Sequence, residues 1–211
     1  MLYIVGIGPG SKEYLTQKAM AIVKQAEITV GSKRAIDLFD EINEKIIFNV
    51  KDLDEKLEAS VNLAKSGKDI AILSTGDPGF SGVLKPIKRI AKSKDFSEDN
   101  IKVIPGISSL QLAASENKIS WDDANIMTFH GRENIEDILD VINNGKKTIA
   151  LPSRKVKDMA QFLIDNGIDK NRKAIVCERL SYPDEKIVEN TLEEISKSEF
   201  TYMCVMVIHE I

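Results

Sequence analysis

The sequence predicts an α/β fold with two domains and mostly parallel strands. Short apolar runs rich in β-branched residues alternate with stretches in which apolar residues recur every three or four positions. Some of these runs, such as Ile70–Leu73, are apolar throughout, as expected for a strand buried on both faces of a parallel sheet. The alternation restarts after Lys118–Ala124. We therefore expect two α/β domains, residues 1–117 and 118–211.

The first domain is expected to alternate strands with helices. Apolar runs predict strands at Leu2–Ile7, Ile28–Val30, Ile70–Leu73 and Ile101–Ile104. Helical spacing predicts helices at Leu15–Ala26, Leu53–Ala64, Val83–Ala91 and Ser108–Ser115. In the second of these helices, Leu57, Val61 and Ala64 share one face. Because helices connect the strands, the strands should pair in parallel.

The second domain repeats the pattern at first and then changes. Strands are predicted at Asn125–Phe129, Thr148–Leu151, Ala174–Cys177, Lys186–Val188 and Tyr202–Ile208. Helices are predicted at Ile135–Ile142 and Val156–Leu163, with a helical turn at Leu192–Ile195. The last strands follow one another with little helix between them, which indicates an antiparallel contribution near the C-terminus.

Charge and composition limit the partners. The 211 residues carry a net charge of −4, with 29 basic and 33 acidic residues interspersed, and aromatic residues make up 6%. Nucleic acids and anionic membranes attract surfaces with excess positive charge, and single-stranded nucleic acid also needs stacked aromatic rings, so neither partner is expected. The apolar opening MLYIV before Gly6 is too short for a signal peptide or a membrane span.

Cysteine and histidine usage indicates a metal-free protein from a reducing compartment. Cys177 and Cys204 lie in apolar runs, which predicts buried free thiols and suits the cytoplasm. His130 and His209 are far apart in the sequence, and no spacing typical of a zinc or iron–sulfur site occurs. No protein-bound catalytic metal is therefore expected.

Glycine-rich loops follow three of the predicted strands, at Gly6–Gly10, Gly76–Gly82 and Pro105–Ser109. In an open α/β sheet, ligands bind beyond the carboxyl ends of the strands, and glycine allows a ligand to approach the backbone closely. The alternative is that each loop is only a tight connection, with Asp77, Ser81 or Ser108 capping the next helix. Three such loops after successive strands favour a ligand-binding rim.

The loops differ from common nucleotide sites. The glycines of Gly6–Gly10 are spaced Gly-x-Gly-x-Gly, and Pro9 removes an amide that a pyrophosphate would need. Val30 and Gly31 stand where an acidic partner for a ribose would be expected, and no phosphate-loop lysine signature occurs. A conventional nicotinamide or nucleoside-triphosphate site is therefore not expected.

Taken together, four motifs resemble the tetrapyrrole methyltransferase family. They are GIGPG (Gly6–Gly10), Leu15-Thr16, TGDPGFSG (Thr75–Gly82) and PGISSLQLAA (Pro105–Ala114), and they occur in the family's order over nearly the whole chain. The resemblance implies that S-adenosylmethionine binds in a cleft between the two α/β domains.

Later motifs resemble the cobalt-precorrin C-5 methyltransferases within that family: WDDA (Trp121–Ala124), FHGRE (Phe129–Glu133) and ERLSYPDEKIVENTL (Glu178–Leu192). The resemblance implies methyl transfer to C-5 of cobalt-precorrin-6B, giving cobalt-precorrin-7, with cobalt arriving in the corrinoid substrate. It also implies a homodimer. The chain is too short for the second domain of bifunctional relatives, so a separate C-15 methyltransferase and decarboxylase is the expected transient partner.

The resemblance further implies the residues that bind the cofactor. They are Pro9, Gly76, Asp77, Phe80, Ser81, Gly82, Ser108 and Ser109, with Leu151 and Leu180 on the adenosine side. For Asp77 the alternative is a structural turn carboxylate. Transfer of a methyl group from a sulfonium is chiefly a positioning task, and no catalytic base is identified.

The implied substrate is fringed with carboxylates, which arginine and lysine recognise best. The candidates for binding it are Lys33, Arg34, His130, Arg132, Arg154 and Arg179. An ordinary surface cation is the alternative for each, or a satisfied histidine for His130. Two other functions stay open: methylation at another ring position of a precorrin or uroporphyrinogen, and a non-catalytic module that binds a nucleotide without turnover.

Overall fold

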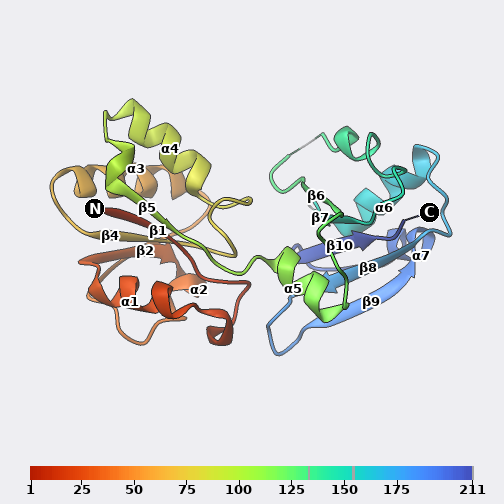
Figure 1. Cartoon of the computed structure of the whole chain (residues 1–211), viewed down its shortest axis with the longest axis horizontal. Helices are drawn as coiled ribbons and strands as arrows, with labels where there is room; N and C mark the ends of the chain where they lie inside the picture. Colours follow the sequence, from red (N-terminus) through yellow and green to blue (C-terminus); the bar gives the residue numbers. More distant parts are fainter. Residues whose placement is uncertain (133, 154, 211) are drawn as a thin grey trace. The chain divides into compact units, whose positions relative to one another are not determined.

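The computed structural model describes residues 1–132, 134–153 and 155–210, which form two compact units, Met1–Ser108 and Ser109–Ile211 (Figure 1). The units divide earlier than the boundary expected after residue 117. Helix α5 (Ser109–Glu116) belongs to the second unit because it packs against strands of the second sheet. Arg154, one of the predicted cations, lies outside the described residues.

The first unit is built on a five-stranded sheet in the order β3-β2-β4-β1-β5. Its strands are β1 (Leu2–Gly6), β2 (Ile28–Ser32), β3 (Glu44–Phe48), β4 (Ile70–Ser74) and β5 (Ile101–Ile104). All neighbouring strands pair in parallel. The predicted parallel α/β architecture of this half is confirmed.

Helices cover both faces of the first sheet (Figure 1). They are α1 (Gln17–Gln25), α2 (Lys33–Ile36), α3 (Leu53–Lys65) and α4 (Leu84–Ser93), with short 3-10 helices η1 (Lys12–Tyr14) and η2 (Glu98–Asn100). Ile4 packs with Leu57 and Ile87 on the side of α3 and α4, whereas its neighbour Val5 packs with Val23 on the side of α1. Adjacent strand residues point to opposite faces, so a strand buried on both sides is apolar throughout.

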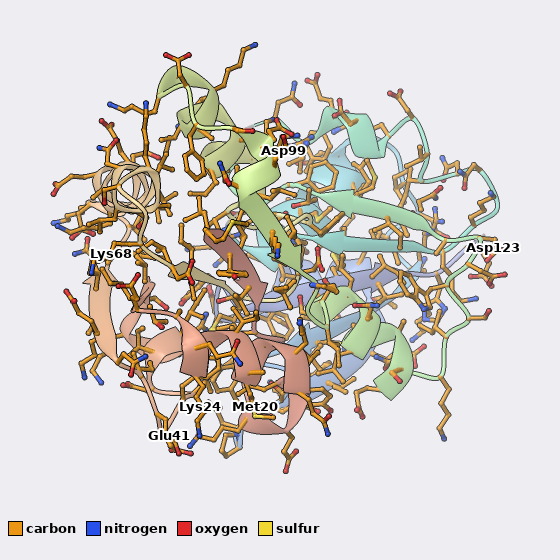
Figure 2. The ribbon with its side chains drawn as sticks, turned by 60° about the vertical axis from the view of Figure 1, so that its left-hand side comes forward. Met20, Lys24, Glu41, Lys68, Asp99 and Asp123 are labelled. Atoms are coloured by element: carbon orange, nitrogen blue, oxygen red, sulfur yellow. The ribbon has the colours of Figure 1, made fainter. Side chains whose placement is uncertain are left out.

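Strand β3 was not predicted from the sequence. Its sequence EKIIF begins with charged residues, and as an edge strand it is only partly buried, so it lacks the uninterrupted apolar run of a central strand. Contacts with α1 and with the residues after α1 hold the segment that leads into β3. The Asn43 side-chain amide donates to the Ala26 carbonyl at 2.9 Å, and Lys24 pairs with Glu41 at 2.7 Å (Figure 2).

The second unit contains a mixed five-stranded sheet in the order β6-β7-β10-β8-β9. Its strands are β6 (Asn125–Thr128), β7 (Thr148–Leu151), β8 (Lys173–Glu178), β9 (Lys186–Thr191) and β10 (Cys204–Ile208). β6 and β7 pair in parallel, and the remaining neighbours pair antiparallel. The antiparallel contribution predicted near the C-terminus is confirmed.

The second sheet is also covered on both faces. The helices α6 (Val156–Asp165) and α7 (Leu192–Ser196) pack with Val176 and Met206 in the main core of this unit. The strand neighbours Cys177 and Val205 therefore point to the other face. There α5 packs against β7 and β10, and the Asn117 amide donates to the Cys177 sulfur at 3.2 Å.

The predicted helix over Ile135–Ile142 is wrong. Only the 3-10 helix η3 (Glu136–Ile138) forms there, followed by turns. Its apolar residues are buried as their spacing indicates, but contacts with distant residues set the backbone. The buried Arg172 donates to the Ile142 carbonyl at 2.7 Å and to the Asn143 side chain at 2.9 Å, which stabilises the turns.

Candidate functional site

Three loops emerge side by side at one edge of the first sheet, because β1 lies between β4 and β5 and all three strands are parallel. We call the loops Gly6–Gly10, Gly76–Gly82 and Pro105–Ser109 the first rim. The Gly76 N–H donates to the Gly8 carbonyl at 2.8 Å, and the Gly8 N–H donates to the Gly76 carbonyl at 3.4 Å. The prediction that the glycine loops share an edge is confirmed.

Contact between backbones explains two of the glycines in the first rim. A Cβ atom on Gly106 would lie 2.3 Å from the carbonyl oxygen of Gly76. A Cβ atom on Gly6 would lie 2.4 Å from the nitrogen of Gly106. No side chain fits at these distances. The loops therefore pack backbone against backbone, which accounts for part of the glycine pattern without a ligand.

Asp77 connects the second loop of the rim to the third. Its Oδ1 accepts a hydrogen bond from the Gly79 N–H at 2.8 Å, which shapes the Gly-Asp-Pro-Gly turn. Its Oδ2 accepts one from the Gly106 N–H at 3.2 Å. These bonds support the structural alternative for Asp77. Each carboxylate oxygen can accept more than one hydrogen bond, so Asp77 can hold the turn and also accept a hydrogen bond from a ligand.

The other predicted cofactor residues of the first unit lie on the same rim with graded exposure. Pro9 and Gly76 are buried, Phe80, Gly82 and Ser108 are half-buried, and Ser81 is exposed. Ser81 has a left-handed backbone with φ of 57°, which is uncommon for a residue with a side chain. Ser109 is the first residue of α5 and so belongs to the second unit.

Of the two predicted cations in α2, Arg34 contacts the residue that precedes the second loop of the first rim. Its Nη2 donates to the Thr75 Oγ1 at 3.2 Å, between the end of β4 and the second loop. Lys33 instead pairs with Asp37 at 2.5 Å, one helical turn away, and both side chains are exposed. Such a pair contributes only about 0.3–0.5 kcal/mol. The contact between Arg34 and Thr75 has no signal in the sequence, because it joins α2 to the residue after β4, which is distant in the sequence.

The second unit has an edge of similar construction, which we call the second rim: residues 129–132 after β6, Leu151 at the end of β7, and residues 179–182 after β8. Strands β6, β7 and β8 run in one direction and β10 runs in the opposite direction, so the carboxyl ends of the first three meet the start of β10. Leu151 ends β7 and is half-buried, and Leu180 follows β8 with 5% of its surface exposed. The structure therefore places both predicted adenosine contacts at one edge.

His130 and Arg132 lie on the loop that follows β6 at the second rim. The preceding Phe129 is fully buried and anchors this loop, while the His130 and Arg132 side chains are exposed. Arg132 Nη1 lies 3.6 Å from the Asp137 carboxylate, and the His130 backbone N–H donates to Thr128 Oγ1 at 3.3 Å. Both side chains are therefore accessible to an anionic group.

The segment after β8 has an unusual backbone. Arg179 and Ser181, on either side of Leu180, have left-handed φ values of 50° and 69°. A left-handed conformation costs a residue with a side chain about 1–2 kcal/mol. Arg179 Nε donates to Asp184 Oδ2 at 2.7 Å, and this hydrogen bond lowers the pKa of the Asp184 carboxyl. From the sequence, Arg179 was predicted to be a substrate-binding residue, with an ordinary surface cation as the alternative, although the density of charges in ERLSYPDE was a signal of local pairing.

Other features of the described residues limit the chemistry. Within these residues no cluster of three or more His, Cys, Asp or Glu side chains could hold a metal ion. Cys177 and Cys204 are free and buried, as predicted, and burial raises their pKa values to about 11 and about 12. None of the helices described here is long and apolar enough to cross a bilayer.

Each rim, taken by itself, presents groups that S-adenosylmethionine requires. The second rim provides apolar side chains at Leu151 and Leu180 that suit an adenosine. The first rim provides loop backbone and the Asp77 carboxylate, which suit a sulfonium and an amino acid end. The residues present therefore fit this cofactor.

Comparison with known proteins identifies the family that the sequence motifs resemble. Residues 1–196 match the family described as tetrapyrrole (corrin/porphyrin) methylases. The chain is 47% identical to the "Probable cobalt-precorrin-7 C(5)-methyltransferase" of Methanocaldococcus jannaschii, over 98% of this chain and 97% of that protein. It is 27% identical to the decarboxylating precorrin-6Y C(5,15)-methyltransferase of a Sinorhizobium species, over 83% of this chain but only 41% of that protein.

The solved structures agree on the fold. The uroporphyrin-III C-methyltransferase of Thermus thermophilus, in complex with S-adenosylhomocysteine, superposes with a TM-score of 0.77, covering 99% of this chain and 96% of that one at 22% identity. One conclusion follows from the two α/β units with their glycine loops, from the family match over 196 residues and from the relative that is similar along nearly the full length. This chain is a member of the tetrapyrrole (corrin/porphyrin) methylase family.

Proposed function

We propose that this protein transfers a methyl group from S-adenosylmethionine to C-5 of a cobalt-precorrin in cobalamin synthesis. The observation that carries the proposal is the 47% identity, along almost the entire length of both chains, to a relative named for this reaction. The glycine loops that meet at the first rim supply the matching local geometry.

The cofactor is proposed to contact residues of both rims. On the first rim these are Pro9, Gly76, Asp77, Phe80, Ser81, Gly82, Ser108 and Ser109, and on the second rim Leu151 and Leu180. S-adenosylmethionine supplies an electrophilic methyl group on a positively charged sulfur. The protein's task is to hold that group in line with an electron-rich ring carbon, which needs no side-chain nucleophile.

The corrinoid is proposed to bind through its peripheral carboxylates. Arg34 beside the first rim and His130 and Arg132 on the second rim are the candidates best supported by their positions and exposure. Lys33 is a weaker candidate because Asp37 already neutralises it. Arg154 remains a candidate from the sequence alone.

The assay for the reaction tests cobalt-precorrin-6B and cobalt-precorrin-7 separately as methyl acceptors. The resemblance in the sequence makes cobalt-precorrin-6B the acceptor and cobalt-precorrin-7 the product, whereas the relative's name couples cobalt-precorrin-7 with methylation at C-5. Mass spectrometry with a carbon-13 methyl donor gives the number of methyl groups added, and carbon NMR gives the ring position. Label at another ring carbon would contradict the C-5 assignment. Binding without turnover of any corrinoid would favour a non-catalytic module.

The oligomeric state, the partner enzyme and the cellular location belong to the same proposal. A relative is named for combined C(5,15) methylation with decarboxylation, whereas the Methanocaldococcus jannaschii relative is named for C(5) alone, and a separate C-15 methyltransferase and decarboxylase is proposed as partner on that basis. A homodimer and a cytoplasmic location complete the proposal, the latter supported by two free, buried thiols. Light scattering coupled to size-exclusion chromatography tests the dimer.

Cofactor binding is the first experiment. We expect titration calorimetry to detect S-adenosylhomocysteine binding to the wild type, and Asp77→Ala to weaken it at least tenfold, or about 1.4 kcal/mol. The matched control is Asp99→Ala, because Asp99 is an exposed aspartate before β5, away from the rim (Figure 2). Failure of the wild type to bind either S-adenosylmethionine or its demethylated product would overturn the proposed function.

A further inference from the structure

The strained segment after β8 places one buried leucine at the second rim. Leu180 lies between Arg179 and Ser181, whose backbones are both left-handed. Only 5% of Leu180 is exposed, so its position is set by packing. Strained backbones of this kind persist only where surrounding contacts hold them, and they cluster at functional sites.

The Arg179 side chain supplies three of those contacts. Its Nε donates to Asp184 Oδ2 at 2.7 Å, and its guanidinium lies 4.6 Å from the centre of the Tyr182 ring. Its Nη1 contacts the Met203 sulfur at 3.8 Å. A planar guanidinium pairs with a carboxylate and stacks on a ring in a fixed geometry, which the compact ammonium of lysine reproduces poorly.

Backbone hydrogen bonds complete the same cluster. The Arg179 N–H donates to the Met203 carbonyl at 2.8 Å, which ties the segment to the start of β10. The Ser181 N–H donates to Glu185 Oε2 at 2.6 Å, and the Tyr182 N–H donates to the Arg179 carbonyl at 3.1 Å. The turn around Leu180 is therefore fixed from both sides.

These contacts argue against a direct role for Arg179 in binding the substrate. Its charge is already paired with Asp184, and 30% of its side chain is exposed. His130 and Arg132, by contrast, are exposed at the same rim. Arg179 is thus placed to shape the rim rather than to meet a ligand.

We propose that Arg179 is a positioning residue for the cofactor: through Asp184, Tyr182 and Met203 it holds Leu180 where the adenosine of S-adenosylmethionine packs. The inference rests on the proposed function, because it requires that Leu180 contacts the cofactor. It deepens that function, because it states that the turn at residues 179–182 determines the shape of the surface on which the adenosine packs.

The test compares Arg179→Lys with Arg89→Lys. Arg89 of α4 also pairs with an aspartate, Asp54 at 3.5 Å, but lies on neither rim. We expect Arg179→Lys to weaken S-adenosylhomocysteine binding at least tenfold in calorimetry and to raise the KM for S-adenosylmethionine more than it lowers kcat. Arg89→Lys should change neither quantity.

A double-mutant cycle separates positioning from general destabilisation. If Arg179 acts through Leu180, the variant carrying both Arg179→Lys and Leu180→Ala should bind S-adenosylhomocysteine no more than about twofold more weakly than Leu180→Ala alone. Asp184→Asn should reproduce part of the Arg179→Lys effect, and it serves as the test variant if Arg179→Lys fails to fold, as judged by circular dichroism.

The outcomes are distinguishable. Failure of the wild type to bind the cofactor product would remove the proposed function itself. Normal binding by the wild type and by Arg179→Lys would overturn this inference alone. Fully additive losses in the cycle, or a change confined to the KM of the corrinoid, would also overturn it, since Arg179 would then act elsewhere or touch the substrate directly.

Discussion

At the scale of single residues, the first rim depends on atoms that hold its loops together. Gly106 lies against the carbonyl of Gly76 and donates its N–H to Asp77, so one residue takes part in both the packing and the polar link. The glycines and the aspartate were identifiable in the sequence. Their mutual contacts were not, because they join positions on different strands.

We expect Gly106→Ala to destabilise the protein by about 2–3 kcal/mol, because the new methyl group would overlap the Gly76 carbonyl and force the loops apart. S-adenosylhomocysteine binding should weaken with it. Denaturant unfolding and calorimetry measure the two effects. Gly145→Ala is the control: a Cβ there meets no atom within 4 Å, so it should cost only about 1–2 kcal/mol for its left-handed backbone and leave binding unchanged.

The buried thiols predict resistance to modification. At about pH 8, neither Cys177 nor Cys204 should react with Ellman's reagent in the folded protein, whereas both should react in denaturant.

Burial raises the folded pKa of Cys177 from 9.0 to about 11, so above pH 9 the unfolded chain loses this proton first. The thiol's contribution to the free energy of unfolding is therefore complete below pH 9 and should be lost between pH 9 and about 11. Rapid reaction of either thiol in the folded protein would contradict the assigned burial.

At the scale of elements, helix ends show how local sequence and backbone geometry can conflict. α5 ends in a Schellman motif: the Ile119 N–H donates to the Ala114 carbonyl at 2.8 Å and the Lys118 N–H to the Ser115 carbonyl at 3.0 Å. The residue at the left-handed position is Lys118, with φ of 54°, where α3 has Gly67. The sequence predicts α5, but Lys118 does not identify its end.

We expect Lys118→Gly to stabilise the protein by about 0.5–1 kcal/mol, because glycine relieves the left-handed strain and loses only part of that gain to its greater freedom in the unfolded chain. The midpoint of thermal unfolding should rise by roughly 2–4 °C per kcal/mol for a protein of this size. Lys118→Ala is the matched control, since it removes the charge but keeps the Cβ atom. An equal rise for alanine would show that charge, rather than backbone strain, is responsible.

Elements also differ in how far their sequence predicts them. The central strands are apolar on both faces and were all predicted, whereas the edge strand β3 was missed because exposure allows charged residues in it. The segment Ile135–Ile142 has helical apolar spacing but folds as turns held by Arg172. Spacing reports which residues are buried, and it does not report which backbone conformation buries them.

At the scale of the whole molecule, the two units have separate cores and separate rims. A cofactor that contacts both rims should protect amides in both units. We expect hydrogen exchange with S-adenosylhomocysteine to slow in residues 6–10, 76–82 and 105–109 and also in residues 129–132 and 179–182. Ligand at about 100 times its Kd should raise the free energy of unfolding by about 2.7 kcal/mol.

The control for that experiment is adenosine, which should protect the second rim more than the first because it lacks the methionine end. Protection confined to one unit with S-adenosylhomocysteine would contradict the expected binding of the cofactor to both. Protection of the edge away from the rims, around Arg172 and His209, would point to a different site.

The sequence by itself determined the α/β class, the two-part organisation, the central strands and the glycine loops, because these follow from local periodicity and turn chemistry. Only the tertiary structure decided which loops touch. It placed Asp77 on the amide of Gly106, Arg34 on Thr75, and Arg179 on Met203, which precedes β10. The physical reason is that apolar spacing and glycine content encode how a segment is buried or bent, whereas partners distant in sequence are chosen by strand order and packing of the complete chain.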